Sequence, residues 1–406
     1  MTSCLLQRAT VVHVDETGRA SHRSVDVRVA DGRIAEVADA NTIASTADDR
    51  VDDLNGWVLL AAAVEPHAHL DKAFLAERVE NPTGDLMGAI EAMRSSRHLL
   101  GVEETIERAE RAARLMAANG FAAVRTHADT TVEHGLRSIE ALVEVKRRVA
   151  DVIDVEIVSL CGWPCVGPAH ADQRALLRDA MQVGADLVGG VPHLEDDPRA
   201  ATELLLQTAV DHGAGVDLHT DETLDASILG LADLLDAVEA GFELPVTASH
   251  CVSLGVQPEA TQREIAERVA AAGVSVVALP HTNLFLQGRG HTPMPRALTA
   301  VGALRAAGAN VAFGADNLQD PFNPVGRACP FETAGLAIAT SHLLPHEAWS
   351  AVSAAGTRAL GRNMIVIEPE SQADLVAVPA TTLREAIAFG PTDRKVWRRG
   401  NRIDRQ

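Results

Sequence analysis

The sequence predicts an α/β protein: a (β/α)8 TIM barrel with a small composite β-sandwich domain formed by both ends of the chain. Three observations predict this fold. The chain has 406 residues, 47% of them are hydrophobic, and short β-branched apolar runs alternate eight times with longer amphipathic segments. Barrels of this kind routinely form one long domain. The alternation starts near residue 57, and we expect the barrel to occupy residues 57–364.

Each predicted barrel strand is a nearly continuous apolar run, as expected for a parallel sheet that is buried on both faces. In chain order the eight runs cover residues 58–69, 121–129, 155–161, 187–193, 215–222, 245–251, 275–280 and 310–316. The segments between them carry apolar residues every three or four positions, which is the spacing of one helix face. Residues 102–120, VEETIERAERAARLMAANG, are an example.

The two ends of the chain have a different pattern. Alternating apolar and polar residues in ATVVHVD (9–15) and SVDVRVADGRIAEVA (24–38) predict strands joined by a turn, and so do ADLVAVPA (373–380) and KVWRRGNRI (395–403). Neither end is long enough to bury a core alone. We therefore expect residues 1–56 and 365–406 to form one small β domain beside the barrel.

Charge and composition exclude several classes of partner. The chain has 36 Lys and Arg against 56 Asp and Glu, a formal net charge of −20, which opposes binding to nucleic acid or anionic membranes. The start of the chain lacks the pattern of a secretory signal, and no apolar run is long enough to span a membrane. The five cysteines form no C-x-x-C pair, which favours free thiols. We expect a cytoplasmic protein, and a homo-oligomer as is common for such barrels.

Polar residues gather at the ends of the predicted strands. In VEPHAHLD (64–71), His67, His69 and Asp71 share a face if the strand extends that far. Later strand ends carry His127, Asp129, His193, His219, Glu222, His250 and Asp316. In this barrel class the C-terminal strand ends form the reactive face. Imidazoles with a carboxylate suit a divalent cation such as Zn²⁺ or Fe²⁺, and the absence of a lysine in DLVGGVPH (186–193) favours one ion over two.

Seven segments in this order resemble the amidohydrolase superfamily, and within it the cytosine deaminase-like group: VEPHAHLD, VRTHAD, GADLVGGVPH, DLHTDE, TASHC, LQGR and NVAFGADNLQDPFNPVG. The chain is also similar to N-isopropylammelide amidohydrolase. The resemblance implies that His67, His69, His219 and Asp316 bind one divalent metal ion (Zn or Fe). It also implies that Glu222 is the proton shuttle and that His250 contacts the metal-bound water. A β domain built from both chain ends is a further feature of that superfamily.

This chemistry predicts a metal-dependent hydrolase with a small heterocyclic substrate. A bound divalent ion lowers the pKa of its water from about 15.7 towards about 7. Asp316 and His250 would orient the hydroxide, and Glu222 would pass a proton to a ring nitrogen. We expect deamination of an amino-substituted pyrimidine, triazine or related ring. The alternatives are hydrolysis of a cyclic amide or removal of an alkylamine. A non-catalytic barrel is disfavoured because every expected ligand type is present.

The predicted substrate contacts depart from the cytosine deaminase pattern. Cys165 follows Pro164 where cytosine deaminases carry a glutamine, and Asn317 stands where they carry a second aspartate. The ring therefore meets a different hydrogen-bond pattern. Gln287 could read the ring, as the resemblance suggests.

Other polar and aromatic residues have two interpretations each. Trp163 and Phe322 are candidates for stacking on a flat ring or for packing. Lys72 meets either an anionic substrate group or a neighbouring carboxylate. His127 and Asp129 support the ligands or belong to a core network. His193 is a pocket residue or a polar strand end, and a loop carrying His281 and His291 could cover the barrel mouth.

Overall fold

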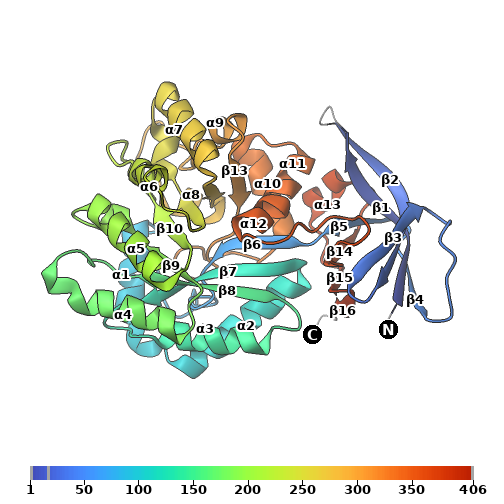
Figure 1. Ribbon diagram of the computed structural model, residues 1–406, viewed down its shortest axis with the longest axis horizontal. Coiled ribbons are helices and arrows are strands. Elements are labelled where there is room, and N and C mark those ends of the chain that lie inside the picture. Colours follow the sequence, from blue (N-terminus) through green and yellow to red (C-terminus); the bar gives the residue numbers. More distant parts are fainter. Residues whose placement is uncertain (1–2, 16–18, 404–406) are drawn as a thin grey trace.

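The computed structural model describes residues 3–15 and 19–403, and within them the chain forms two eight-stranded sheets. One is the barrel, and the other contains strands from both chain ends and stands beside it (Figure 1). This arrangement confirms the predicted (β/α)8 barrel with a small β domain.

The barrel strands pair in chain order, each parallel to the next. They are β6 (Ala63–Ala68), β7 (Phe121–Thr130), β8 (Asp154–Cys161), β9 (Leu187–Gly190), β10 (Val216–Thr220), β11 (Val246–His250), β12 (Ser275–Ala278) and β13 (Asn310–Phe313). An isolated parallel bridge between Ala68 and Asp316 joins the first strand to the segment after the last. The ring is thus closed at the end where the predicted ligands lie.

Helices surround this ring. They are α1 (Leu86–Ser96), α2 (Val102–Ala118), α3 (Arg137–Arg148), α4 (Ala171–Val183), α5 (Pro198–His212), α6 (Gly230–Glu239), α7 (Glu259–Ala272), α8 (Pro280–Leu286), α9 (Val301–Ala306), α10 (Pro330–Ser341), α11 (Pro345–Val352) and α12 (Ala354–Ala359). Short 3₁₀ turns are η1 (Arg97–Leu99), η2 (Pro168–His170), η3 (Pro192–Leu194) and η4 (Val252–Val256). Helix α5 shows how their ends are set. Asp197 caps its first turn by accepting from the Ala200 N–H, and Gly213 ends it with a φ of +63°.

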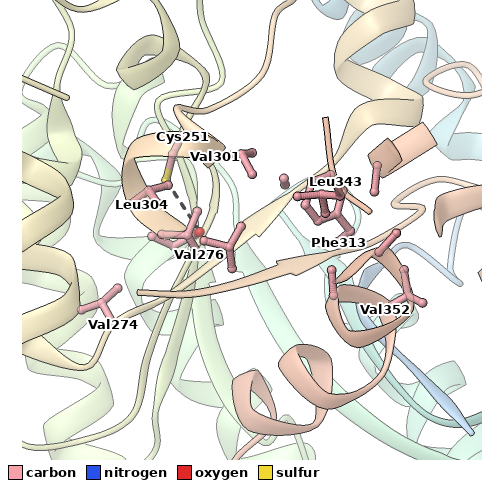
Figure 2. Packing of buried hydrophobic residues seen from close by; sticks show 14 of the residues in the cluster. Cys251, Val274, Val276, Val301, Leu304, Phe313, Leu343 and Val352 are labelled. Atoms are coloured by element: carbon pink, nitrogen blue, oxygen red, sulfur yellow. Dashed lines mark hydrogen bonds between the residues drawn. The ribbon is translucent and has the colours of Figure 1, made fainter. Parts of the chain in front are cut away.

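The main core lies between the strands and the helices. Val276 of β12 and Phe313 of β13 belong to the same buried cluster as Val301 and Leu304 of α9 (Figure 2). Cys251 lies in this cluster as a buried free thiol. Burial, with the nearby charges of Asp221 and Asp217, raises its pKa well above the ordinary range, so it behaves as a small neutral side chain.

The small β domain contains β1 (Ser3–Val14), β2 (Ala20–Ala30), β3 (Arg33–Asp39), β4 (Asp49–Asp53), β5 (Trp57–Ala61), β14 (Leu375–Pro379), β15 (Lys395–Arg398) and β16 (Asn401–Ile403). Strand β5 pairs antiparallel with β14 and so joins the two chain ends in one sheet. Helix α13 (Leu383–Phe389) follows β14.

One strand prediction needs correction. Residues 58–69 form two strands, and the first, β5, belongs to the small domain rather than to the barrel. Leu59 packs in the core of the small domain, whereas Val58 and Leu60 pack in the main core. With both faces buried, β5 shows no alternation and cannot be told from a barrel strand by its pattern. The predicted domain limits otherwise stay predictions.

Among the described residues, no helix has the length and apolar character needed to cross a membrane.

Candidate active site

Three histidines and one aspartate meet at the C-terminal end of the barrel. His67 lies on β6, His69 directly follows that strand, and His219 lies on β10. Their side chains offer ring nitrogens within 4.8 Å of one another. The Nε2 atoms of His69 and His219 are 3.2 Å apart. Asp316, after β13, places Oδ1 3.3 Å from Nε2 of His69 and 3.7 Å from Nε2 of His67.

The proton on His67 is held by a partner that sequence analysis did not identify. Ser249 Oγ donates to Asp217 Oδ1 (2.7 Å) and lies 2.9 Å from Nδ1 of His67. Because the hydroxyl proton goes to the carboxylate, the serine accepts from Nδ1–H, and Nε2 of His67 is left without a proton. In the sequence, this partner could have been found from the position of the serine, which directly precedes His250 in the TASHC segment.

The cluster suits a divalent cation. His67 Nε2 and Asp316 Oδ1 are buried and have no hydrogen-bond partner in the described part of the chain, a costly state that a cation would relieve. Burial holds the pKa values of His67, His69 and His219 well below the ordinary range, so the rings are in the neutral form that binds metals. Three imidazoles and a carboxylate match the donors of catalytic zinc and iron sites.

An acid and a second imidazole lie beside this cluster and share one amide. The Asn283 side chain on α8 donates to Glu222 Oε1 (3.0 Å), and Nδ1 of His250 lies nearer to its amide nitrogen (3.1 Å) than to its amide oxygen (3.4 Å). Glu222 Oε1 and His250 Nδ1 are 3.4 Å apart. Burial, with the nearby charge of Asp316, raises the pKa of Glu222 well above its ordinary value. Burial lowers the pKa of His250 to about 3, so its ring is neutral. Asn283 was not predicted from the sequence.

The backbone at this end is held in an unusual conformation. Asp221, His250, Cys251 and Asp316 all have positive φ, between 49° and 70°. Non-glycine residues rarely adopt these angles, and they cluster where a site requires them. Glu65 helps to hold Asp316 in place, because its carboxylate accepts from the Ala315 N–H at 3.1 Å. Burial raises the pKa of Glu65 to about 8.

Asp71 is not part of the cluster, contrary to the shared face expected from VEPHAHLD. Strand β6 ends at Ala68, so the alternation of side chains does not continue to Asp71. Its carboxylate instead accepts from the Asp129 N–H (3.0 Å) and from Ser138 Oγ (3.0 Å). Lys72 lines the cavity, and its ammonium pairs with a neighbouring carboxylate, that of Asp129 (2.7 Å), while its contact with an anionic substrate group stays a prediction.

A cavity opens above the cluster, with about 770 Å³ of empty space that is partly open to solvent. Four of the predicted substrate-binding residues line it: Lys72, Trp163, Asn317 and Phe322. His69, His219, Glu222, His250 and Asp316 also line it. The structure therefore brings most of the predicted site residues to one cavity.

Cys165 and Gln287 lie outside this lining. Cys165 is buried in the main core, and its backbone N–H donates to Glu195 Oε1 (2.6 Å). Gln287 follows the last residue of α8 and lines a neighbouring groove together with Glu222. Asn317 lines the cavity, but its amide already donates to Asp320 Oδ2 (2.7 Å).

Sequence analysis left two interpretations for each of two further histidines, His127 and His193. His127 is buried and stacks on His67 with 4.0 Å between ring centroids, and its Nε2 is 3.7 Å from Asp217 Oδ1. The stacking places His127 behind one of the predicted ligands. His193 lines the cavity, and its Nδ1 is 3.1 Å from the His219 carbonyl oxygen. That contact places the ring proton on Nδ1 and leaves Nε2 as an acceptor.

A closed (β/α)8 barrel with a cation site and a buried acid at its strand ends defines the class of metal-assisted hydrolases. The chain belongs to the amidohydrolase family, whose family model matches residues 74–404. It is accordingly a hydrolase that acts on C–N bonds, as predicted.

Its relatives support the same assignment. A pterin deaminase of Rhizobium rhizogenes is 34% identical over 99% of this chain and 94% of its own. An N-isopropylammelide isopropyl amidohydrolase of Pseudomonas sp. is 23% identical over 89% of each chain. Among solved structures, a 5-methylcytosine deaminase from Klebsiella pneumoniae, liganded with 5-fluorocytosine, superposes with a TM-score of 0.87 at 27% identity, covering 99% of this chain and 97% of that one. An N-isopropylammelide isopropylaminohydrolase from Burkholderia multivorans superposes with a TM-score of 0.84 at 26% identity, covering 99% and 98%.

Proposed function

We propose that the protein is a metal-dependent deaminase that converts the amino group of a small N-heterocycle to a carbonyl and releases ammonia. One observation carries the proposal. Glu222, a buried carboxyl group whose pKa is raised well above its ordinary value by burial and by the charge of Asp316, lies in the same cavity as the cation-binding cluster. Such a group can give a proton to a ring nitrogen while the adjacent ring carbon is attacked.

His67, His69, His219 and Asp316 would hold the divalent cation. A cation at this position supplies an activated water and polarises the reacting carbon. Ser249 keeps Nε2 of His67 available for that role, because its Oγ accepts a hydrogen bond from Nδ1–H while its own proton is donated to Asp217.

Glu222 and His250 would handle the protons. Asn283 donates to Nδ1 of His250, so that ring carries its proton on Nε2, 4.0 Å from Asp316 Oδ2. His250 can therefore donate a hydrogen bond to an oxygen between itself and Asp316. Glu222 would give its proton to the ring nitrogen, take one proton from the attacking water and deliver that proton to the leaving amine. The second proton of the water, released as the carbonyl forms, would return Glu222 to its starting state.

A two-ring heterocycle of the pterin type is our first candidate substrate. The pterin deaminase relative is similar over nearly the whole of both chains. Apart from the polar cluster and the basic residues Lys72, Arg94 and Arg97, much of the cavity wall is apolar, with Ile90, Met93, Leu286 and Phe322 among its residues, which suits a flat ring. Asn317, which lines the cavity, stands where cytosine deaminases carry an aspartate, so cytosine is a weaker candidate.

Ammonia release tests this proposal. Protein loaded separately with Zn²⁺, Fe²⁺ or Mn²⁺ is assayed over amino-pteridines, amino-pyrimidines, amino-triazines and purines, beside a Glu222→Gln control. We expect release from at least one compound and its loss in the control at unchanged metal content. Silence across the panel from metal-loaded protein contradicts the proposal.

Removal of an alkylamine is the second candidate, because Asn317 lies in an ADN triplet that resembles N-isopropylammelide amidohydrolase. In this chain both activities would take place in the same cavity, and they differ in the leaving group. Detection of a primary alkylamine from N-alkyl triazines, without ammonia from any unsubstituted amine, would favour this second activity.

A further inference from the structure

Helix α1 forms one wall of the cavity and presents two kinds of side chain to it. Leu86, Ile90, Met93, Arg94 and, just after the helix, Arg97 line the cavity. Their spacing of three or four residues places them on one helix face. The stripe is apolar where the helix begins and cationic where it ends.

Arg94 is held in position by an aromatic ring and has no anionic partner. Its guanidinium carbon is 4.3 Å from the centroid of the Trp163 ring. Among the described residues, no carboxylate forms an ion pair with Arg94. The other cations of the wall differ: Arg97 pairs with Glu133 (2.9 Å), and Lys72 pairs with Asp129 (2.7 Å).

This arrangement suits an anion that arrives with the substrate. A guanidinium fixed on an aromatic face keeps a planar set of donors, which matches a carboxylate in a two-point contact. A chain with a net charge of −20 repels anionic molecules, so an anionic substrate needs a local cation at its binding site. Arg94 is exposed whereas the histidine cluster is buried, so the anion would lie at the outer part of the cavity.

We propose that the substrate carries an anionic substituent, a carboxylate in the first instance, and that Arg94, stacked on Trp163 and assisted by Arg97, binds it. The inference rests on the proposed function, because it adds a substituent to the heterocycle that would be deaminated. It makes Arg94 a residue that determines specificity.

Arg94 also has a purely structural interpretation. A basic residue in the last turn of a helix is stabilised by the helix dipole, and stacking on tryptophan is a common packing contact. That interpretation predicts no dependence on the charge of the ligand. Arg111 provides a matched control, because it is an exposed arginine 4.0 Å above the Phe74 ring and lines a different groove.

The test compares one ring with and without the charge. Binding of 2-amino-4-oxopteridine and of its 6-carboxylate is measured by calorimetry on metal-loaded full-length Glu222→Gln protein, which slows turnover, and ammonia release is measured on the wild type. We expect the carboxylate to bind about tenfold to a hundredfold more tightly than the neutral ring. We expect Arg94→Met to remove most of this preference, Arg111→Met to keep it, and added salt to weaken only the carboxylate.

The outcomes separate the two proposals. Equal affinity for the two ligands, equal loss of both in Arg94→Met, or no binding of either overturns the role of Arg94. Ammonia from the neutral ring without a preference for the carboxylate also overturns it and leaves the deaminase proposal standing. A preference for the carboxylate that depends on Arg94, without ammonia from either ring, supports the anion site and contradicts the deaminase proposal.

Discussion

The two ends of the barrel treat buried polar groups in opposite ways. At the C-terminal end, His67 Nε2 and Asp316 Oδ1 are buried without a hydrogen-bond partner among the described residues. At the other end, where the barrel meets the small domain, Asp154 pairs with Arg398 (2.6 Å), and Arg398 also pairs with Asp374. Charges that neutralise one another within the chain stabilise the fold, and Arg398 keeps its two carboxylate partners although its Nε and Nη2 atoms have no hydrogen bond. Asp316 instead faces imidazoles and has no Lys or Arg partner in the described part of the chain, which marks a place where a cation can bind.

The largest effect is expected from Asp316→Asn. The substitution keeps the shape of the side chain but removes its negative charge, which is the anionic member of the cation site. We expect activity to fall by more than about a thousandfold and metal content to fall with it, while the fold persists. Metal analysis and circular dichroism measure the two effects. If the variant keeps full metal and full activity, the unpartnered Asp316 oxygen does not mark a cation site.

Glu222→Gln should reduce activity by about a hundredfold to ten thousandfold, because the amide cannot deliver the proton. Metal content should stay unchanged, since Glu222 is not among the proposed ligands. Kinetics on protein of known metal content measure the effect. A variant that loses its metal would instead make Glu222 a ligand and move the acid to another residue.

Arg398→Met tests the opposite end. The Arg398 and Asp374 side chains are only 3% and 1% exposed, so removing the arginine leaves the buried carboxylate without its cationic partner, with only the Arg399 N–H and the Gln372 amide as donors. We expect a loss of about 3–5 kcal/mol in the free energy of unfolding, with metal affinity unchanged. Denaturant unfolding measures it. The double variant Arg398→Met/Asp374→Leu should recover part of the loss, and a double variant no more stable than the single one would contradict the pairing argument.

The sequence predicts the barrel and its cluster well because both depend on local patterns. Eight apolar runs are enough to predict eight strands, and in such a barrel all strand ends meet. The residues at the strand ends could therefore be placed at one face without knowledge of any distance, and the resemblance to the amidohydrolase superfamily selected His67, His69, His219 and Asp316 among them as ligands. Strand β5 was misplaced because a strand buried on both faces has no alternation.

The supporting residues could not be predicted in this way. Ser249 contacts His67, which is 182 positions away, and Asn283 contacts His250, which is 33 positions away. Arg94 contacts the ring of Trp163, which belongs to a different segment of the chain. Serine, asparagine and arginine are common at surfaces and turns, so their type carries little information. Cys165 and Gln287 show the converse: each was assigned by its place in a motif, and the fold directs it away from the cavity.

Ser249→Ala should weaken metal binding by about tenfold to a hundredfold, because His67 loses the acceptor that holds its proton on Nδ1. Titration of metal-free protein with Zn²⁺ measures the affinity. Ser253→Ala is the matched control, since Ser253 is also buried but its hydroxyl has no partner among the described residues. Equal affinities in the two variants would show that the contact between Ser249 and His67 does not tune the ligand.

The smallest effect is expected from Arg263→Gln on α7. Arg263 pairs with Glu259 at 2.7 Å, a distance typical of a strong ion pair, but the two side chains are 61% and 83% exposed. Water screens the charges, so we expect a change below about 0.5 kcal/mol in the free energy of unfolding. Denaturant unfolding in parallel with Arg398→Met compares two arginine–carboxylate pairs that differ mainly in burial. Similar losses of stability in the two variants would mean that burial does not make the Arg398 pairs important. The contrast between the two ends of the barrel would then not depend on burial.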